Sequence, residues 1–411
     1  MRIAWFSPLP PVRSGISAYS ADLVPRLATA HAIDGFSEGN VRDFLWQERR
    51  APYDLVVYQL GNAPCHDYMW AYLVAFPGLV VLHDARLHQS RARSLLKQER
   101  FDDYRQEFYY DDPAAIRDFA EYAVVGLGGP IYHYWPMLRA VVSTARLVAV
   151  HNPRVAVDLR ERFPGVEIDA IHLGTSLLDA GAAARARTRG ALGLADEAMV
   201  FAAFGKITAD KRIGAILRAF DAIARERADV HLLLAGDTSD YPSLGAELSG
   251  LAHAARVHVT GYVADDAIGS YLAAADACLC LRWPTALETS ASWLQCLAAA
   301  RPTVISDLAH LVDIPPAVAL KIDLLDEDAA LTRAMRALAG DATLRETLAR
   351  EGHAYWSAQH TLDVMAADYQ RLIAKAAARP APVVDDLPAH FHADHSDTAR
   401  AILRAFELPE F

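Results

Sequence analysis

Short apolar runs recur along this chain and alternate with longer stretches of helical patterning. In the first half the runs are Arg2–Phe6, Leu55–Gln59, Leu79–Leu82, Leu147–Val150 and Ile168–His172. In the second half they are Val200–Phe204, His231–Ala235, Val257–Thr260, Ala277–Leu281, Thr303–Ser306 and Leu320–Ile322. Short runs rich in Val, Ile and Leu and bounded by Gly, Pro or Asp predict strands that are buried on both faces. The helical stretches between them predict crossovers between parallel strands.

The alternation of strands and helices restarts after Gly174, which predicts two domains. We expect an α/β protein with two doubly wound, Rossmann-like parallel sheets facing each other across a cleft. The expected divisions are a first domain at 1–176, a second at 177–358, a long terminal helix at 359–379 and a tail at 380–411. Leu178 to Asp196 is expected to form a linker and a short helix. A further short helix is expected in the tail from Asp397 to Phe406, capped by Ser396.

Residues 84–145 interrupt the alternation, because they contain charged helical stretches and no clear strand. They predict a helical insertion in the first domain. The insertion contains an aromatic cluster of Phe108, Tyr109, Tyr110, Phe119 and Tyr122. A second aromatic stretch, Tyr132 to Trp135, has two open explanations, which are stacking on an acceptor sugar and packing in a core.

Composition narrows the class of protein. The 411 residues are 53% hydrophobic and 22% charged, which is typical of a folded globular chain. The formal net charge of -11 argues against broad nucleic-acid binding. No apolar run is long enough to span a membrane, and the first strand is too short for a signal-peptide core, so a cytoplasmic protein is expected. The cysteines, which have no zinc-type spacing, are Cys65, Cys278, Cys280 and Cys296.

Two loops of the second half contain the candidate chemistry. The segment Phe204–Arg212 includes Lys206 and Lys211, and the segment Arg282–Ser290 includes Glu288. Both follow a strand and precede a helix, so both should line the crevice at the carboxyl ends of the strands. Lysine cations and the free N–H groups of a helix N-terminus favour phosphate. The two loops therefore predict a cleft that binds a diphosphate with a polar group attached.

These loops, together with Pro10–Ile16, Leu82–Asp84 and Ile171–Gly174, resemble the retaining group 1 (family 4) glycosyltransferases over about residues 1–375. The resemblance implies the two-domain GT-B architecture and transfer of a hexose from a nucleotide-diphospho-sugar to a hydroxyl acceptor. The acceptor would be a saccharide or a lipid-linked saccharide, and no cofactor or metal would be required. Dehydrogenases are disfavoured, because the first turn lacks G-x-G-x-x-G and Gly126–Pro130 follows no strand.

The resemblance also implies roles for individual residues. Lys206 and Lys211 would hold the diphosphate, with Lys206 at a position where many relatives have arginine. Glu288 would accept hydrogen bonds from hydroxyls of the donor sugar, while backbone N–H groups at Thr289 and Ser290 would meet the phosphate. His83 would contact the donor sugar near the reacting carbon.

Two further departures from the family pattern, and the role of Asp84, affect the expected site. Cys296 stands eight residues after Glu288, where relatives have a second glutamate that binds the ribose, and a thiol is a poor acceptor. Ser14 and Gly15 replace a Gly-Gly pair, and Gly15 would let the backbone approach a ligand. Asp84 is expected to orient His83 or to cap the next helix rather than to act as a base.

Alternatives from other classes remain. Cys296 favours a nucleotide-sugar-binding pseudoenzyme or partner subunit, whereas a nucleotide-sugar epimerase on the same scaffold would need additional cleft carboxylates. A basic helix could make weak peripheral contact with the inner face of a membrane through Arg86, Arg91, Arg93, Lys97 and Arg100, although acidic residues dilute it. The tail residues His390, His392, Asp394 and His395 are expected to be solvated rather than to bind a metal.

Overall fold

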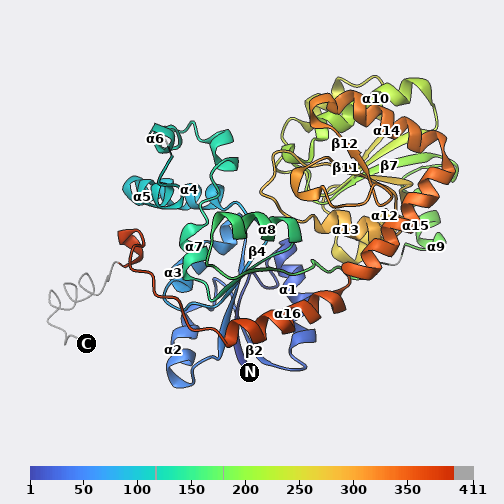
Figure 1. The fold of residues 1–411 in the computed structure, drawn as a ribbon. Coiled ribbons are helices and arrows are strands. Elements are labelled where there is room, and N and C mark those ends of the chain that lie inside the picture. Colours follow the sequence, from blue (N-terminus) through green and yellow to red (C-terminus); the bar gives the residue numbers. More distant parts are fainter. Residues whose placement is uncertain (116–117, 179, 393–411) are drawn as a thin grey trace.

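The computed structural model describes residues 1–115, 118–178 and 180–392. It contains two α/β domains, each built on a six-stranded parallel sheet with helices on its faces (Figure 1). The strand order is β2-β1-β3-β4-β5-β6 in the first sheet and β12-β11-β10-β7-β8-β9 in the second. The prediction of two doubly wound domains is therefore confirmed.

The first sheet contains one strand that the sequence analysis missed. Its strands are β1 (Arg2–Phe6), β2 (Ala32–Phe36), β3 (Leu55–Leu60), β4 (Leu79–Leu82), β5 (Leu147–Val150) and β6 (Ile168–Ala170). The missed strand, β2, lies at the edge of the sheet, and most of its residues are at least partly exposed. Asp34 and Gly35 interrupt its apolar pattern, and Asp34 pairs with Arg2 of the neighbouring strand at 3.1 Å. An edge strand needs only a little apolar surface, so its sequence lacks the apolar run by which the buried strands were recognised.

The helices of the first domain are α1 (Gly15–Leu27), α2 (Arg42–Arg50), α3 (Trp70–Leu73), α4 (His88–Leu96), α5 (Phe101–Asp111), α6 (Asp118–Val124), α7 (Arg139–Thr144) and α8 (Pro153–Arg162). The expected helical insertion comprises α4 to α7 and stands to one side of the first sheet (Figure 1). It has a small core of its own, in which Tyr104 and Phe108 are fully buried. Tyr132 and Trp135 pack against this core, whereas Tyr134 is 75% exposed.

The second sheet has all six of the strands expected from the sequence. They are β7 (Met199–Phe204), β8 (Val230–Ala235), β9 (Val257–Val259), β10 (Ala277–Cys280), β11 (Thr303–Ser306) and β12 (Leu320–Ile322). Its helices are α9 (Ala182–Ala191), α10 (Ile213–Glu226), α11 (Leu244–Ser249), α12 (Ile268–Ala274), α13 (Ala291–Ala298), α14 (Glu327–Gly340) and α15 (Ala342–Gln359). The central strand β7 is buried at every position, as its apolar sequence predicts.

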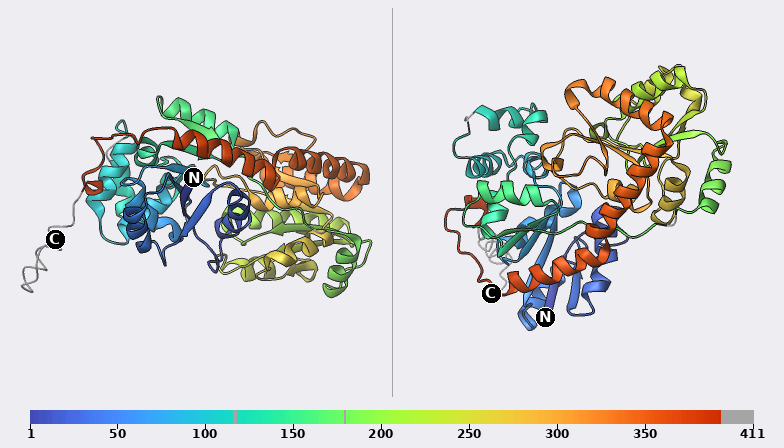
Figure 2. Two further views of the ribbon diagram at one scale, coloured as in Figure 1. Left: turned by 90° about the horizontal axis from the view of Figure 1, so that it is seen from below. Right: turned by 45° about the vertical axis from the view of Figure 1, so that its right-hand side comes forward.

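The last long helix, α16 (Leu362–Ala377), returns from the second domain to the first. In Figure 2 it continues from the direction of α15 and lies along the first domain. The expected single helix at 359–379 is thus preceded by a break, where the backbone N–H of Thr175 donates to the His360 carbonyl at 2.9 Å. The side chain of Thr361 caps α16 by accepting from the backbone N–H of Val364.

A shared hydrophobic cluster holds the two domains together. It extends from Trp5 in the first sheet, through Met365 and Tyr369 of α16, to Trp293 of α13. Burying this much apolar surface between domains favours one relative orientation over many. The geometry of the cleft therefore depends on α16 as well as on the two sheets.

Part of the segment 380–392 packs against the first domain, so the expectation of a solvated tail is wrong for His390, whereas His392 is exposed as expected. Leu387 is 8% exposed, and the His390 ring lies 2.8 Å from Glu107 Oε1 of α5. The expected helix at Asp397 to Phe406 falls outside the described residues, as do Asp394 and His395. Among the residues that are described, no helix is long and apolar enough to cross a bilayer.

Candidate functional site

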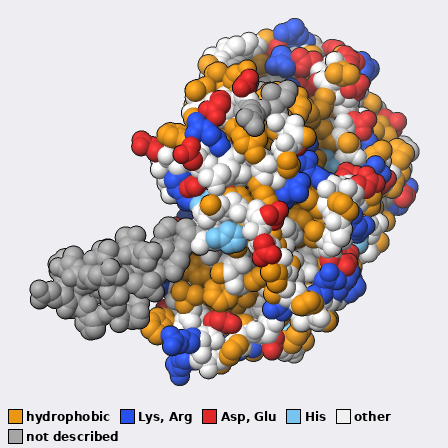
Figure 3. Space-filling model, turned by 60° about the vertical axis from the view of Figure 1, so that its left-hand side comes forward, with side chains coloured by type: hydrophobic (Ala, Val, Ile, Leu, Met, Phe, Trp, Pro, Cys, Tyr) orange, Lys and Arg blue, Asp and Glu red, His pale blue; other side chains and the backbone are white. Residues whose placement is uncertain are grey.

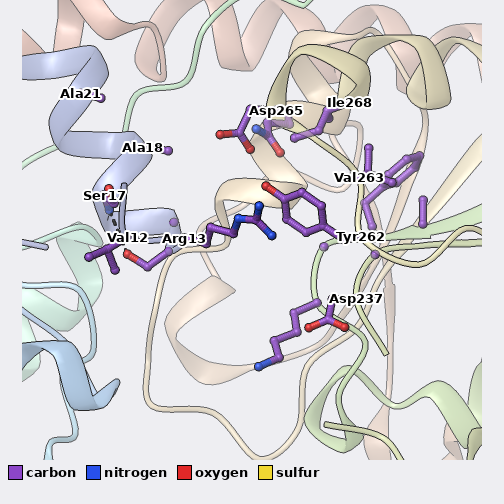
Figure 4. Close-up of a pocket in the computed structure, with 18 of the residues that line it drawn as sticks. Val12, Arg13, Ser17, Ala18, Ala21, Asp237, Tyr262, Val263, Asp265 and Ile268 are labelled. Carbon is purple, nitrogen blue, oxygen red and sulfur yellow. Dashed lines mark hydrogen bonds between the residues drawn. The ribbon is translucent and has the colours of Figure 1, made fainter. Parts of the chain in front are cut away.

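A cleft of about 760 Å³ lies between the two domains. The first domain lines it with the loop after β1 and the start of α1, and the second domain lines it with the ends of β7 and β8 and the loop after β9. Figure 4 shows Arg13 pointing from the first domain toward the ring of Tyr262 in the second. The Arg13 guanidinium carbon lies 5.0 Å from the centre of that ring, close enough for a cation–π contact.

Lys211 is a half-buried cation at the end of β7. Its Nζ donates to the Phe204 carbonyl at 2.7 Å and lies where a side chain on Gly205 would collide with it, at 2.7 Å from an ideal Cβ. Burial, and then the positive charge of Arg282, lower the pKa of Lys211 to about 8. Gly205 has φ 82, a conformation that glycine adopts without strain. Because Gly205 has no side chain, the Lys211 ammonium can lie close to the backbone of the cleft loop.

Lys206 lines the cleft itself and is more exposed. Its Nζ pairs with Asp240 Oδ2 at 2.6 Å, and its side chain is 51% exposed. An ion pair this exposed is weak, so an anion in the cleft could compete for the ammonium at little cost. The structure thus brings both predicted lysines to the same loop but gives them different surroundings.

Glu288 is held by three donors from its own loop. Arg282 Nε lies 2.9 Å from Oε1, while the Thr285 hydroxyl and the Ala286 backbone N–H each donate to Oε2 at 2.8 Å. Arg282 also pairs with Asp210, beside Lys211. The sequence analysis missed Arg282, although its position directly after β10 was a usable signal. The carboxylate is therefore fixed in place before any ligand binds.

The helix α13 begins shortly after Glu288. Its first backbone N–H groups point out of the N-terminal end and have no carbonyl partner within the helix. The Ser290 hydroxyl caps this helix by accepting from the Trp293 backbone N–H at 3.3 Å. The Thr289 hydroxyl donates across the domain boundary to the His151 carbonyl at 2.9 Å. The side chains of both residues are thus used structurally, which leaves their backbone N–H groups as the candidates for contact with an anion.

His83 belongs to a buried polar network in the first domain. Its Nε2 lies 2.8 Å from Gln59 Oε1, and Gln59 in turn bonds the Tyr369 hydroxyl at 3.0 Å. Tyr19 donates to the same hydroxyl at 2.6 Å. Burial, and then the neighbouring His151, lower the pKa of His83 well below its usual range. The ring is therefore neutral and firmly oriented.

Asp84 has neither of the two partners expected for it. Its Oδ2 accepts from the Asn62 backbone N–H at 2.6 Å, while the His83 ring bonds Gln59 and the next helix begins only at His88. The expectation that Asp84 orients His83 or caps that helix is wrong, because three residues separate Asp84 from α4 and its carboxylate accepts from the Asn62 backbone instead.

Ser14 and Gly15 lie at the start of α1, on the wall of the cleft. The Ser14 hydroxyl caps α1 by accepting from the Ser17 backbone N–H at 3.0 Å. A Cβ on Gly15 would meet no atom within 4 Å, so this backbone faces open space in which a ligand could approach. The placement agrees with the expected location, and the ligand contact itself stays a prediction.

The comparisons with known proteins agree with this geometry. The family described as glycosyl transferases group 1 matches residues 198–341, which include both lysines and Glu288. Sucrose-phosphate synthase from Thermosynechococcus elongatus superposes with a TM-score of 0.68 at 16% identity, covering 91% of this chain and 98% of that chain. No curated protein matches the sequence significantly.

Two further solved structures share the architecture. Anabaena HepE, in complex with UDP-glucose, has a TM-score of 0.65 at 14% identity and covers 91% of this chain and 99% of its own. WaaG, a glycosyltransferase involved in lipopolysaccharide biosynthesis, has a TM-score of 0.62 at 13% identity and covers 90% and 99%. The chain has the GT-B fold of the group 1 glycosyltransferases. The fold that the resemblance implied is therefore confirmed, and the family match itself covers residues 198–341.

The position of Cys296 in this fold differs from the expectation. Its side chain is fully buried in a cluster with Cys278, and its Sγ lies 3.8 Å from Cys280 Sγ. Gln295, one residue earlier, lines the cleft instead. Adjacent residues of a helix point about 100° apart, so a shift of one residue exchanges the core side for the cleft side. At this point of the helix the cleft is therefore lined by Gln295, whose amide both donates and accepts hydrogen bonds.

The expected basic helix is not a basic surface. Arg91 is buried against Glu107 and lies over the Trp70 ring, Arg93 pairs with Asp67, and Arg86 bonds the Thr285 carbonyl. On the face seen in Figure 3, basic and acidic side chains are interspersed. The charges that suggested a membrane contact are thus largely neutralised within the protein.

Within the described part of the chain, no group of three or more His, Cys, Asp or Glu side chains is arranged to hold a metal ion. His390, which the sequence offered as a ligand candidate, bonds Glu107 instead.

Proposed function

We propose that this protein transfers a hexose from a nucleotide-diphospho-sugar to a hydroxyl acceptor, with retention of anomeric configuration. The acceptor would be a saccharide or a lipid-linked saccharide in glycan, polysaccharide or glycolipid synthesis. UDP-glucose bound to HepE supports a nucleotide-sugar as the class of donor. The proposal keeps the cytoplasmic location expected from the sequence.

One observation carries the proposal. A fixed carboxylate, a half-buried lysine and the N-terminus of α13 converge at the carboxyl ends of β7 and β10, beside the interdomain cleft. A nucleotide-diphospho-sugar needs these three groups, because its hydroxyls donate to a carboxylate and its phosphates bind cations and free N–H groups.

The bond-breaking step requires stabilisation of a leaving diphosphate. Lys206, Lys211 and the first N–H groups of α13 would take up the negative charge that develops on it. No metal is required for that task, since fixed cations and dipoles supply the same stabilisation. Glu288 would hold the sugar hydroxyls, and His83 would contact the sugar from the first domain. Retention is proposed to arise from departure and attack on the same face, so no nucleophilic carboxylate is assigned.

A binding protein without turnover has less support than the sequence suggested. That alternative rested on Cys296, whereas the cleft residue is Gln295, which can bond ribose hydroxyls. An epimerase stays a second candidate, because Asp84 supplies the additional carboxylate near Glu288 that such a reaction needs.

A panel of UDP-, GDP- and ADP-sugars tests the proposal. A donor that binds the native state should raise the thermal midpoint. Donors that bind are then incubated with and without saccharide acceptors, and NMR identifies the products and their anomeric configuration. A new glycosidic bond with the configuration of the donor supports the transferase. Conversion of the donor without an acceptor would favour the epimerase, and binding without conversion would favour the pseudoenzyme or partner subunit.

A further inference from the structure

Two cysteine side chains of the second domain contact each other directly. Cys280 is the last residue of β10, and Cys296 lies in α13. The Cys280 thiol donates to Cys296 Sγ at 3.8 Å, and Cys296 is fully buried while Cys280 is partly exposed. The sulfurs of a disulfide are about 2.05 Å apart, so these two would have to approach each other by about 1.8 Å. The pair is therefore close to bonding distance, and a small molecule can reach it from the Cys280 side.

The two cysteines stand at either end of the loop that carries Glu288. Arg282, whose guanidinium bonds the Glu288 carboxylate, follows Cys280 by two residues. Gln295, which lines the cleft, directly precedes Cys296. A bond between the two thiols would close a ring of chain that contains the whole loop and most of α13. A change at the thiols would therefore act on both ends of the loop.

The first turn of α13 also borders the Lys211 ammonium. An ideal Cβ on Gly205 would lie 2.7 Å from Lys211 Nζ and 3.9 Å from Ser292 Cβ, so the lysine and the helix border the same small space. Burial, and then a neighbouring guanidinium, lower the pKa of Lys211 to about 8, whereas negative charge on the two thiols would raise it. A nearby cation favours the thiolate, which is the form of cysteine that attacks a disulfide. The ammonium that is proposed to bind the diphosphate therefore also favours reaction of the thiols.

A third thiol, that of Cys278, lies beside the pair. It precedes Cys280 by two residues on β10 and belongs to the same buried cluster as Cys296. Its side chain has no exposed surface, so an oxidant reaches Cys280 first. Cys65, which is also partly exposed, lies in the first domain and is distant in the chain. Cys280 is therefore the member of the cluster that is open to attack.

We propose that Cys280 and Cys296 form a reversible disulfide that weakens donor binding. The oxidant is a low-molecular-weight disulfide such as oxidised glutathione. The Cys280 thiolate attacks one of its sulfurs, forms a mixed disulfide and releases one glutathione thiolate. Cys296 then loses its proton and attacks the Cys280 sulfur, which releases the second glutathione. The two cysteines lose two electrons and two protons in total, and oxidised glutathione takes up both to become two molecules of reduced glutathione.

The effect on donor binding rests on the proposed function and follows from the geometry of the pair. Cys296 is enclosed by the core, which leaves its side chain little room to rotate, so α13 has to follow its sulfur toward β10. The required approach of about 1.8 Å exceeds the tolerance of about 0.5 Å within which a binding site must be held. The helix N-terminus and Gln295 would thus move relative to Lys211.

The experiment treats the full chain with oxidised glutathione, blocks the remaining thiols and maps the peptides by mass spectrometry without reduction. A peptide that links Cys280 to Cys296 should form and should disappear on treatment with dithiothreitol. Titration of both forms with UDP-glucose, or with another nucleotide-sugar that binds the reduced protein, should give a Kd at least about tenfold higher for the oxidised form. Reduction should restore the lower value.

Matched variants assign the effect to this pair. Cys280→Ser and Cys296→Ala should each bind the donor as reduced wild type does and should be insensitive to oxidised glutathione. Cys65→Ser should respond like wild type. Thermal melts of the variants establish that they are folded.

Different results overturn different parts of the proposal. Thiols that stay reduced in the folded protein, or a link made through Cys278, would overturn the assignment of the pair. A link between Cys280 and Cys296 with unchanged donor affinity would overturn its effect on the site. A reduced protein that binds no nucleotide-sugar would overturn the proposed function and the control of donor binding with it, whereas the peptide map would still decide whether the disulfide forms.

Discussion

The guanidinium of Arg86, in the first domain, donates a 3.0 Å hydrogen bond to the carbonyl of Thr285 in the second. The hydroxyl of that same threonine donates to Glu288. Leu287, between them, has φ 64 and packs against the hydrophobic core of the first domain. Docking of the two domains at this point and orientation of the Glu288 carboxylate are therefore coupled through one short loop.

Removing the Arg86 side chain should weaken that coupling. We expect Arg86→Ala to lower kcat/KM about tenfold, the equivalent of one net hydrogen bond, while leaving the thermal midpoint nearly unchanged. Steady-state kinetics with the donor varied provides the measurement. Arg100→Ala, which removes an exposed pair with Asp103, is the matched control and should have no effect. Equal kinetics for the two variants would separate Arg86 from the orientation of Glu288.

Glu288 is predicted to act on the transition state as well as on the bound donor. Glu288→Ala should lower turnover by at least about a hundredfold, the range seen when a charged contact to a transition state is lost. Rates at saturating donor test this. Glu226→Ala, which removes an exposed carboxylate paired with Arg336, should behave like wild type. Wild-type turnover in Glu288→Ala would remove the residue from the site.

The lysine pair is predicted to bind the diphosphate rather than the nucleoside. Lys206→Ala with Lys211→Ala should weaken binding of a nucleoside diphosphate far more than binding of the nucleoside, because each charged hydrogen bond contributes about 1.5 to 3 kcal/mol. Titration calorimetry compares the two ligands. Lys97→Ala, on an exposed helix end, serves as the control. If both ligands lost affinity equally, the diphosphate would have to lie elsewhere.

Lys211 should make nucleoside diphosphate binding depend on pH. Its pKa of about 8 in the folded protein means that it is charged below that pH and neutral above it. Affinity should therefore fall as the pH rises through about 8, and binding near that pH should be accompanied by proton uptake, since an anion favours the charged lysine. Calorimetry in buffers of different ionisation enthalpy detects the uptake. The Lys206→Ala variant should retain the proton uptake. If the uptake persisted in Lys211→Ala, it would have to be assigned to another group.

Substitutions at the neighbouring residues Gln295 and Cys296 should affect different properties, donor binding for Gln295 and stability for Cys296. Gln295→Ala should weaken donor binding with little change in the thermal midpoint, because its side chain faces the cleft. Cys296→Glu, which would restore the residue type of relatives, should instead destabilise the fold by several kcal/mol, because it buries an unpaired carboxylate among Cys278 and Cys280. Thermal melts and donor titrations of both variants test this. A stable Cys296→Glu variant with tighter donor binding would show that the helix presents Cys296 to the cleft.

The sequence by itself determined the two sheets, the helical insertion and the loops that hold the candidate chemistry. These features are local, because buried strands require continuous apolar runs and strand ends require turn residues. The loops with Lys206, Lys211 and Glu288 were found in this way, and their motifs resemble those of the group 1 glycosyltransferases, whose family model matches residues 198–341. The edge strand β2 was missed because a partly exposed edge requires little apolar sequence.

The tertiary structure decided which side chains face the cleft and what holds them. Counting eight residues from Glu288 selected Cys296, but in the folded protein Cys296 is buried in the core and Gln295 lines the cleft. Arg282 became visible as the partner of Glu288 only through the fold. The pKa of Asp84 likewise depends on burial and on a carboxylate about two hundred residues away in the chain. Contacts between distant segments depend on how the domains pack, and no local pattern in the sequence encodes them.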